Sequence, residues 1–455
     1  MTGRHLHLVG IGGAGMCGLA EILVHTGCRV SGCDAAASER TQHLQRLGVG
    51  IQLGHSTEHL EGVDALVVSA AVGRAEAELE GARRLGLPVV RRAEMLGELM
   101  RSRRGVAIAG THGKTTTTAL TGHLLTVAGC DPTILVGGRA LTLGGHARAG
   151  RGALMVCEAD EFDRAFLELG PEHAVITNLE AEHLDCDGGF DDLASAFAAF
   201  ANRGSAFGLV VLCDDDPGAR SLRGALRRRV LGYGLGADAG LRADEVTATP
   251  AGSEFTLRQD GDKLGRLRLG LPGLHNVRNA IGAVAIGLEL GLDLATLVEG
   301  CAGFPGVARR FERRGERDGV AVVDDYAHHP TELRAVLAAA RQALPGRRLV
   351  AAFQPHLYSR TRDFADDFGR ALTGADVAVV LPVYPAREQP LAGVDASLVV
   401  AAAVRAGHPA VTVGPPVTEA FGFLRGLLRP GDVLLTLGAG DVDRVAAAWL
   451  AGEAR

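Results

Sequence analysis

Three segments of the chain repeat one pattern, in which a short apolar run ends in a turn and a helical pattern follows. The runs begin near residues 5, 104 and 320 of the 455-residue sequence, and strand-like and helix-like stretches alternate after each of them. Such alternation favours parallel sheets with crossover helices, because parallel strands cannot be joined by a tight hairpin. The sequence therefore predicts an α/β fold, in a chain too long for one compact core.

We predict three domains, at 1–103, 104–307 and 308–455, the first and last Rossmann-like and the central one of the phosphate-loop ATPase type. Hinges are expected near 103 and 307, where "GFPGVARRFE" (303–312) precedes the last domain, and the domains are expected to close together. Strands of the last domain are expected in "VAVVDDY", "RRLVAAF", "VAVVLPVY", "AVTVG" and "DVLLTLGAG". Pro330 suits the first turn of a helix. Its apolar stripe comprises Leu333, Val336, Leu337, Ala340 and Leu344.

Composition excludes several classes of protein. A net charge of -6 and a pI of about 6.2 give no basic field that would recruit nucleic acid. The eight cysteines contain neither a C-x-x-C pair nor metal-finger spacing, so we expect buried, reduced thiols. The N-terminus has no signal-peptide pattern, and no window approaches the ~18 apolar residues that a membrane span needs. These features predict a cytoplasmic protein without a membrane partner.

The first glycine loop (residues 10–15) follows an apolar run directly. Gly10, Gly12 and Gly15 give G-x-G-x-x-G, and Asp34 ends the next expected strand. Glycines let the backbone approach a diphosphate at a helix N-terminus, and the acid can hold a ribose hydroxyl. The motif predicts a nucleotide diphosphate without selecting NAD. A tight turn without a ligand is the alternative.

The phosphate loop (residues 110–115) contains an unusual lysine. The chain has only two lysines, Lys114 and Lys263, so 45 of its 47 basic residues are arginine. The standard phosphate-loop pattern has a glycine where this chain has Ile108. A lysine can bridge β- and γ-phosphates as a mobile point charge, whereas the planar guanidinium of arginine fits a closed loop less well. We predict an ATP site here, with the Thr115 hydroxyl on Mg²⁺; a glycine turn with a capping threonine is the alternative.

Acidic residues follow the next two expected strands. The stretch "VCEADEFDRAF" carries Glu158, Asp160, Glu161 and Asp163, and "AVITNLEAEHLD" carries Asn178, Glu180, His183 and Asp185. Ligands of open α/β sheets bind outside the carboxyl ends of the strands. A carboxylate and an imidazole at that edge could hold one or two Mg²⁺ ions against the phosphates. Solvated loops are the alternative.

Two strand ends of the last domain also concentrate polar residues. "VVDDYAHHPTE" (322–332) contains two acids, a tyrosine and two histidines, and "AAFQPHLYSRTRD" (351–363) contains His356, Tyr358, Arg360 and Arg362. Paired arginines suit capture of a carboxylate by bidentate hydrogen bonds. A purely structural role for the histidines is the alternative.

These motifs together resemble the Mur ligase family over essentially the whole chain. The stretches that carry the resemblance are "GIGGAGMCGLAE" (10–21), "RRAEMLGELM" (91–100), "GTHGKTTTT" (110–118), "EADEFD" (158–163), "ITNLEAEHLD" (176–185), "GLHNVRNA" (273–280), "RRFE" (309–312), "DDYAHHPTE" (324–332), "FQPHLYSRTRD" (353–363), "YPAREQP" (384–390) and "LGAGDV" (437–442).

The resemblance implies that the first domain binds a UDP-sugar, the second binds ATP and the third binds an amino acid. It is strongest to the branch that joins L-alanine to UDP-N-acetylmuramate through an acyl phosphate, in cell-wall precursor synthesis. Implied UDP-sugar residues are Gly12, Gly13, Ala14, Gly15, Asp34 and Ser69. Implied ATP residues are Gly110, Thr111, His112, Gly113, Lys114, Thr115, Thr116, Asn276, Asn279, Arg310 and Asp325. The implied catalytic residues are Lys114, Glu158 and His183. The implied magnesium ligands are Thr115, Glu158 and His183. The implied amino-acid pocket comprises Tyr326, His328 and Arg360.

The chain also departs from the family pattern. Relatives usually have Ser, Asn, Asp and Arg where this chain has Phe162, His146, Glu182 and Leu357. The arginine missing at Leu357 would help to grip the incoming amino acid. No lysine lies between 114 and 263, so a carbamylated lysine beside the metal is not expected. A monomer or weak homodimer is expected.

The sequence leaves three other activities open. A sister ligase that attaches a whole tripeptide to UDP-N-acetylmuramate shares features with "EADEFDRAF". An NAD-dependent oxidoreductase would explain the first glycine loop but not Lys114. A nucleotide switch without catalysis would explain the phosphate loop but not the polar clusters of the other segments.

Overall fold

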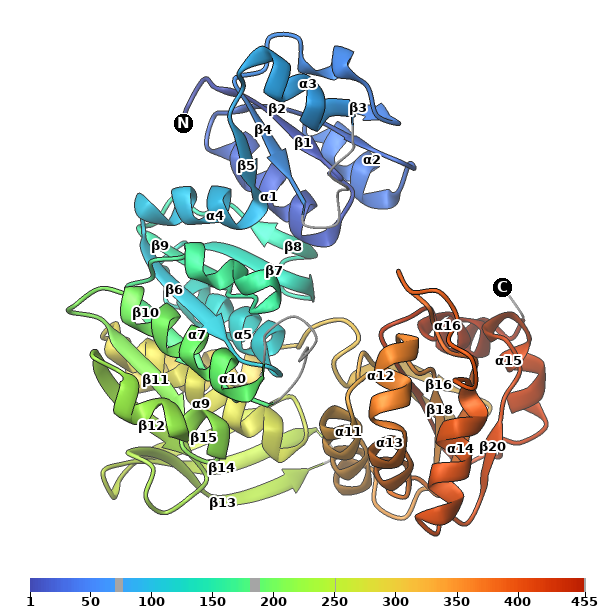
Figure 1. Ribbon diagram of the computed structural model, residues 1–455. Coiled ribbons are helices and arrows are strands. Elements are labelled where there is room, and N and C mark those ends of the chain that lie inside the picture. The colour runs from blue at the N-terminus through green and yellow to red at the C-terminus, as the bar shows by residue number, and fades with distance from the viewer. Residues whose placement is uncertain (70–76, 181–188, 250, 454–455) are drawn as a thin grey trace. The chain divides into compact units, whose positions relative to one another are not determined.

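The computed structural model describes residues 1–69, 77–180, 189–249 and 251–453 (Figure 1). The chain divides into two compact units. The first comprises residues 1–245, 255–267 and 278–305, and the second comprises 246–254, 268–277 and 306–455. The predicted metal ligand His183 lies outside the described residues, as do Glu182, Asp185 and Cys186.

The first sheet is parallel throughout, with strand order β3-β2-β1-β4-β5. Its strands are β1 (His5–Val9), β2 (Arg29–Asp34), β3 (Gly50–Leu53), β4 (Ala65–Val68) and β5 (Val89–Arg91). All five residues of β1 are buried, as expected for a central strand covered on both faces. The helices of this region are α1 (Ala14–His25), α2 (Glu39–Arg46), η1 (Thr57–Leu60), α3 (Ala77–Leu85) and α4 (Arg92–Arg101).

The second sheet has ten strands in the order β15-β14-β13-β12-β11-β10-β6-β9-β7-β8. They are β6 (Arg104–Ala109), β7 (Thr133–Ala140), β8 (Gly145–Arg148), β9 (Leu154–Glu158), β10 (His173–Ile176), β11 (Leu209–Cys213), β12 (Arg229–Gly234), β13 (Leu241–Thr249), β14 (Gly252–Gln259) and β15 (Asp262–Leu269). Strand β6 lies between β9 and β10 and is parallel to both, so their carboxyl ends meet at one edge.

Helices connect and flank these strands. They are α5 (Lys114–Val127), η2 (Phe162–Glu168), α7 (Phe190–Arg203), α8 (Pro217–Ser221), η3 (Leu222–Ala225), α9 (Leu274–Glu289) and α10 (Leu294–Gly303). Helix α5 begins immediately after the turn that leaves β6, so the phosphate loop is a strand–turn–helix junction, as the sequence predicts.

The third sheet has the order β16-β17-β21-β18-β19-β20, with only β16 antiparallel among the pairings described. Its strands are β16 (Glu312–Arg317), β17 (Val320–Asp325), β18 (Leu349–Phe353), β19 (Val377–Val380), β20 (Val411–Val413) and β21 (Val433–Leu437). The five strands predicted for this domain are therefore confirmed, and β16 is an additional edge strand.

The helices of the last domain are α11 (Pro330–Ala343), α12 (Tyr358–Asp363), α13 (Ala365–Leu372), α14 (Ala396–Arg405), α15 (Val417–Arg425) and α16 (Asp443–Ala451). Pro330 stands at the start of α11, with His329 as its N-cap, as predicted. The apolar stripe is confirmed too, because its first four residues are buried and Leu344 packs against the same core.

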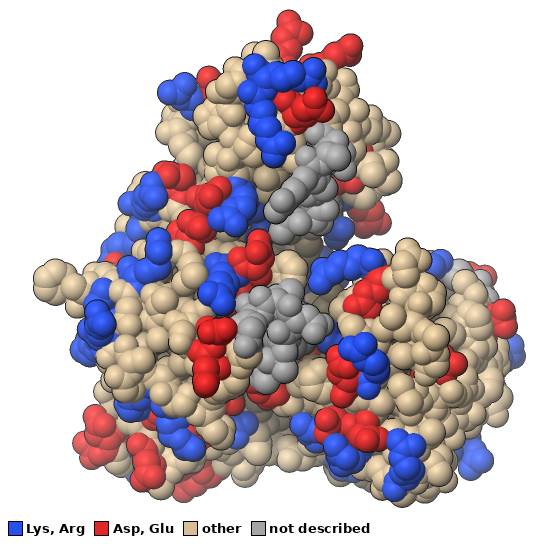
Figure 2. Space-filling model, viewed as in Figure 1, with Lys and Arg blue, Asp and Glu red and all other residues tan. Residues whose placement is uncertain are grey.

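The burial of the described cysteines agrees with the prediction of buried, reduced thiols. Seven cysteines are described; all are free, and all except Cys130 are buried. None of the described helices is both long and apolar enough to cross a membrane. Figure 2 shows acidic and basic side chains interspersed over the visible face instead of gathered by sign.

Candidate active site

The phosphate loop has a backbone that only glycine fits at two positions. Gly110 has φ +138° and Gly113 has φ +81°. A β-carbon at Gly110 would lie 2.0 Å from Thr177 Oγ1, and one at Gly113 would lie 2.5 Å from Asn279 Oδ1. Gly113 is the N-cap of α5 and provides no side-chain cap. The first turn of α5 therefore presents backbone amides in the arrangement that binds anions.

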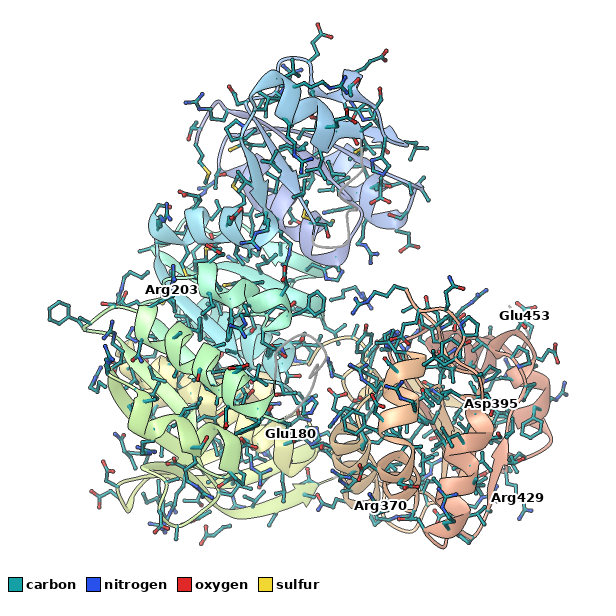
Figure 3. The ribbon with its side chains drawn as sticks, viewed as in Figure 1. Glu180, Arg203, Arg370, Asp395, Arg429 and Glu453 are labelled. Atoms are coloured by element: carbon teal, nitrogen blue, oxygen red, sulfur yellow. The ribbon has the colours of Figure 1, made fainter. Side chains whose placement is uncertain are left out.

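The segment after β10 fixes the shape of this loop. The His112 amide donates to Asn178 Oδ1 at 2.8 Å, and the His112 carbonyl accepts from Thr177 Oγ1 at 2.6 Å and Asn178 Nδ2 at 3.0 Å. The Glu180 amide donates to the Thr111 hydroxyl at 3.0 Å, and Figure 3 marks Glu180. Thr111 and His112 therefore use their polar groups to hold the loop.

The Lys114 ammonium lies among oxygen atoms. It donates to Gly110 O at 2.5 Å, to Thr111 O at 3.2 Å and to both Glu161 oxygens at 2.8 and 2.9 Å. Burial alone lowers the pKa of Lys114, but the neighbouring carboxylates, Glu161 foremost, outweigh it and raise the pKa above the usual value. The lysine is therefore a permanent cation whose internal counter-ion is Glu161. The sequence places Glu161 in an acidic cluster but does not predict this ion pair.

Glu158 lies beside the same loop because β9 ends there, with Glu158 opposite Ile108 of β6. Its Oε1 accepts from the Gly137 amide at 2.6 Å, and the Thr115 hydroxyl also donates to its carboxylate. Burial raises the pKa of Glu158, while these donors and Lys114 oppose the increase. The structure thus brings together Lys114, Thr115 and Glu158. Thr116 is buried in α5, and Asn279 lies against Gly113.

Oxygen donors of this kind fit a magnesium ion. Mg²⁺ prefers hard oxygen ligands and is usually held by one or two carboxylates together with phosphate oxygens. Glu158 supplies a partly buried carboxylate and Thr115 a hydroxyl that already contacts it. The chemistry of the donor set therefore suits the ion.

The first glycine loop is held by charged side chains. The Gly12 amide donates to Asp34 Oδ2 at 2.8 Å, and Arg40 Nε donates to the Gly12 carbonyl at 2.6 Å. A β-carbon at Gly15 would lie 2.8 Å from Arg92 Nη1. Arg40 and Arg92 are cations at a predicted diphosphate site that the sequence reasoning did not single out. Arg92 lies in the quoted stretch 91–100, whereas nothing in the sequence marks Arg40.

The other residues predicted for the UDP-sugar occupy the same end of this sheet. Gly13 is the N-cap of α1 and has no side chain to cap it, and Ala14 is the first residue of that helix. Ser69 directly follows β4. Because β4 is parallel to β1, its carboxyl end lies at the edge from which the loop emerges.

In the last domain, two neighbouring aspartates end β17 and have different partners. Asp324 pairs with Arg309 Nε at 3.1 Å and accepts from Thr436 Oγ1 at 2.6 Å. Asp325 accepts the Phe311 amide at 2.6 Å and the Ala327 amide at 2.8 Å, one on each oxygen. Burial raises the pKa of Asp325 to about 7. Asp324 is thus held by two side chains and Asp325 by two backbone amides, and the predicted ribose contact of Asp325 remains a prediction.

Four side chains form a continuous line across the ends of β17 and β18. Tyr326 and His328 meet edge to face at 5.4 Å between ring centroids, and His328 and His356 at 5.9 Å. Arg360 Nη1 lies 3.5 Å from His356 Nδ1. The structure therefore brings the predicted Tyr326, His328 and Arg360 together through His356. Burial lowers the pKa of His356 to about 4, so it is neutral.

Two further predicted residues, Arg310 and Asn276, lie in this unit, as does Leu357, which departs from the family pattern. Arg310 contacts the Tyr326 ring at 5.3 Å and pairs with Glu332 at 3.4 Å. Asn276 is buried and donates to the Pro272 carbonyl at 2.8 Å. Leu357 is the N-cap of α12 with φ +69°, a conformation that leucine rarely adopts.

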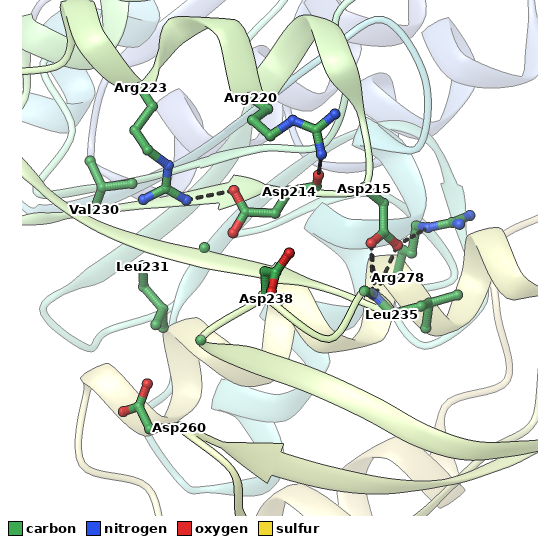
Figure 4. Close-up of a pocket in the computed structure, with 14 residues that line it drawn as sticks. Asp214, Asp215, Arg220, Arg223, Val230, Leu231, Leu235, Asp238, Asp260 and Arg278 are labelled. Carbon is green, nitrogen blue, oxygen red and sulfur yellow. Dashed lines mark hydrogen bonds and ion pairs between the residues drawn. The ribbon is translucent and has the colours of Figure 1, made fainter.

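A pocket of about 930 Å³ lies elsewhere in the first unit (Figure 4). Four of its charged lining residues form two ion pairs: Arg223 with Asp214 at 2.5 Å, and Arg278 with Asp215 at 2.6 Å. Asp215 also accepts the Leu235 amide. These pairs satisfy one another, and no predicted site residue lines the pocket.

Three α/β segments with two glycine loops define a nucleotide-dependent ligase of the Mur type, and family models match each segment. The Mur ligase family catalytic domain matches residues 5–104, the Mur ligase middle domain 108–287 and the Mur ligase glutamate ligase domain 309–440. The chain belongs to the Mur ligase family.

Individual relatives show which Mur ligases this chain is similar to over its whole length. The chain is 46% identical over 450 residues to a UDP-N-acetylmuramate–L-alanine ligase of Nitratidesulfovibrio vulgaris, covering 99% of both chains. Its structure matches the UDP-N-acetylmuramate–alanine ligase of Thermotoga maritima with a TM-score of 0.84 and 29% identity, covering 98% of both chains. A murein peptide ligase from Psychrobacter arcticus matches with a TM-score of 0.72 and 25% identity, over 99% of this chain and 98% of that one.

Proposed function

We propose that this protein joins L-alanine to the lactyl carboxylate of UDP-N-acetylmuramate, with cleavage of ATP to ADP and phosphate. The observation that carries the proposal is the juxtaposition of the Lys114 ammonium, the Thr115 hydroxyl and the Glu158 carboxylate at the carboxyl ends of β6 and β9. The substrates are inferred from relatives of equal length named for this reaction. The murein peptide ligase matches less closely, so a single amino acid is favoured over the tripeptide.

Each domain would hold one reactant. Residues 1–103 would bind the UDP-sugar, with the diphosphate at the first glycine loop between Arg40 and Arg92. Residues 104–307 would bind ATP at the phosphate loop, and residues 308–455 would bring in the amino acid. The domains would close together to align the three, with hinges near 103 and 307.

Activation of the acid would come first. The lactyl carboxylate attacks the γ-phosphorus of ATP, the bond to the bridging oxygen breaks, and ADP leaves with that electron pair. Lys114 would offset the charge that develops on the transferring phosphoryl group, while the amides at the start of α5 orient the phosphates. Mg²⁺, held by Thr115, Glu158 and His183, would supply further positive charge against the phosphate oxygens.

Amide formation would follow. The amine of L-alanine attacks the acyl carbon, the carbon–oxygen bond to phosphate breaks, and inorganic phosphate departs; the amine loses its proton. A free carboxylate is a poor electrophile, and phosphorylation supplies the leaving group that it lacks. Arg360 is the natural partner for the alanine carboxylate because its guanidinium is buried beside neutral His356. Leu357 in place of the usual arginine leaves Arg360 with more of that role.

One assay tests the proposal. Phosphate release is measured with ATP, Mg²⁺ and UDP-N-acetylmuramate, in separate reactions with L-alanine, glycine, L-serine and the wall tripeptide. We expect the fastest release with L-alanine, trapping of an activated acyl group by hydroxylamine, and transfer of labelled carboxylate oxygen to phosphate. Turnover with the tripeptide alone would overturn the choice of substrate. Absence of both the trapped acyl group and the oxygen transfer would overturn the mechanism.

A further inference from the structure

A second cluster of polar side chains comes from two strands of the first sheet and from two helices of the same region. His7 comes from β1, Cys33 from β2, His59 from η1 and Glu78 from α3. One donor atom from each lies within 4.8 Å of the other three. His7, Cys33 and Glu78 are fully buried, and the His59 side chain is 13% exposed. Nothing in the proposed ligase reaction uses these residues.

A relay of hydrogen bonds fixes the tautomer of His7. His5 Nδ1 lies 2.9 Å from the Gly62 carbonyl, which can only accept, so His5 Nδ1 carries the proton and its Nε2 is an acceptor. The Ser31 hydroxyl, 2.9 Å from that Nε2, must then donate to it. Ser31 Oγ is left to accept from His7 Nδ1, also at 2.9 Å. His7 Nε2 therefore carries a lone pair.

That lone pair has no hydrogen-bond partner within the described part of the chain, although His7 is completely buried. An unsatisfied buried acceptor is costly, and one in a native fold calls for an explanation. Burial, together with neighbouring His59, also lowers the pKa of His7 to about 4, which keeps the ring neutral. A neutral imidazole whose second nitrogen is held by a hydrogen bond is the usual form of a histidine metal ligand.

Around Glu78 the donors converge. Its Oε1 accepts from Cys33 Sγ at 3.1 Å, His59 Nδ1 at 3.0 Å and the Ser56 amide at 3.0 Å. His55 Nδ1 lies 3.2 Å from Oε2. Despite its burial, these donors hold the pKa of Glu78 below the usual value, so the carboxylate is ionised. Cys33 is also 3.6 Å from His55, which completes a compact shell of nitrogen, sulfur and oxygen.

We propose that His7, Cys33, His59 and Glu78 form a site for one Zn²⁺ ion. Two imidazoles, a thiolate and a carboxylate are the donors that zinc takes in four-coordinate sites, whereas Mg²⁺ avoids sulfur and nitrogen. Zinc bonds of about 2.0–2.3 Å separate tetrahedral ligands by about 3.3–3.8 Å, so the cluster needs only side-chain adjustment. Binding replaces the proton on Cys33 Sγ, which leaves to solvent. His55 and His59, 26% and 13% exposed, mark the entry side.

The position of the site suggests what the ion would do. The Cys33 carbonyl accepts the amides of Gly10 and Ile11 at 2.9 and 3.1 Å, and the next residue, Asp34, accepts the Gly12 amide. A metal on the Cys33 side chain would therefore brace the strand end that holds the first glycine loop. The ion would be structural, and it would stabilise the folded state in proportion to its concentration over its dissociation constant.

Metal titration of the full chain tests this inference. Protein stripped by a chelator is titrated with Zn²⁺, and separately with Co²⁺, in the absence of nucleotide. We expect one tight equivalent of either ion, a rise in the unfolding temperature, visible absorption of four-coordinate Co²⁺ and a thiolate-to-cobalt charge-transfer band. Weak or absent binding, or a cobalt spectrum without the thiolate band, would overturn the site.

Matched variants locate the ion. Cys33→Ser and His7→Gln should each weaken Zn²⁺ binding by at least about 10- to 100-fold, the loss seen even for supporting residues. Cys28→Ser, a buried cysteine outside the cluster, and His25→Gln, an exposed histidine, should bind as the parent does. If Cys33→Ser folds poorly, the cobalt spectrum of His7→Gln tests the site instead, because loss of the four-coordinate absorption in that variant would show that His7 binds the metal. Undiminished binding in both cluster variants would place the metal elsewhere and refute the assignment.

Discussion

The first glycine loop and the phosphate loop start from the same backbone plan and carry opposite arrangements of charge. In the first, an acid, Asp34, holds the Gly12 amide, and the cations Arg40 and Arg92 stand outside the loop. In the second, the cation Lys114 lies within the loop, and the acids Glu158 and Glu161 face it from the neighbouring segment. If the two loops bind as we propose, the shared backbone selects a phosphate-bearing ligand, and the placement of cation and acid distinguishes a loop that binds from a loop that takes part in the reaction.

The largest effect is expected at the lysine itself. Lys114→Arg keeps the charge but puts a planar guanidinium into a closed loop, so the turnover number should fall by about 100-fold or more. The affinity for UDP-N-acetylmuramate, measured by calorimetry, should not change, because that ligand is assigned to the other loop. A turnover number equal to that of the wild type in this variant would show that the reaction does not require a lysine in the phosphate loop, and would refute the catalytic role that we assign to that loop.

Glu158→Gln should come next. The amide keeps the shape of the side chain but loses the charge that suits Mg²⁺, so half-maximal activity should require about 10-fold more Mg²⁺. The matched control is Asp163→Asn, which changes an exposed acid of the following segment. If both variants required the same Mg²⁺ concentration for half-maximal activity, Glu158 would not be a magnesium ligand.

The first loop is tested by Asp34→Asn. Loss of the charged acceptor on the Gly12 amide should raise KM for UDP-N-acetylmuramate by about 10-fold, since a hydrogen bond to a charged group contributes about 1.5–3 kcal/mol. The turnover number should stay within about 2-fold of the parent value. A fall in turnover with an unchanged KM would reverse the roles that we give to the two loops.

The smallest effect on activity is expected from Glu161→Gln. Removing the internal counter-ion of Lys114 should tighten ATP binding by roughly 2- to 5-fold, because the phosphates then meet less competition for the ammonium. The unfolding temperature without ATP should fall, and ATP should raise it more than in the parent. Weaker ATP binding would show that Glu161 assists the nucleotide instead of competing with it.

Much of this architecture is predictable from the sequence, for identifiable reasons. Strand–glycine–helix junctions are local, so Gly10, Gly113 and Lys114 indicate their own structure. The acids near the phosphate loop follow from the rule that ligands meet the carboxyl ends of parallel strands, and Glu158 is found there. The strands of the last domain are apolar runs bounded by turns, which makes them visible without a structure.

What the sequence conceals depends on contacts between distant segments. The four residues of the proposed zinc site come from four elements, and no short-range spacing relates Cys33 to Glu78. The Lys114–Glu161 pair joins the start of α5 to the residue that precedes η2, 47 positions further along the chain. The sequence marks Asp325 as a ligand group, yet one of its oxygens accepts the Phe311 amide from the segment before β16 and the other accepts the Ala327 amide just after β17.

Strand β21, the last strand of the third sheet in chain order, lies between β17 and β18. Arg309, at the start of that domain, donates to the Gly438 and Gly440 carbonyls just after β21. During synthesis, this sheet therefore cannot close until residues 433–437 have left the ribosome. A polypeptide that ended at residue 430 would lose the centre of the sheet and not its edge, and would leave the facing edges of β17 and β18 unpaired and open to aggregation.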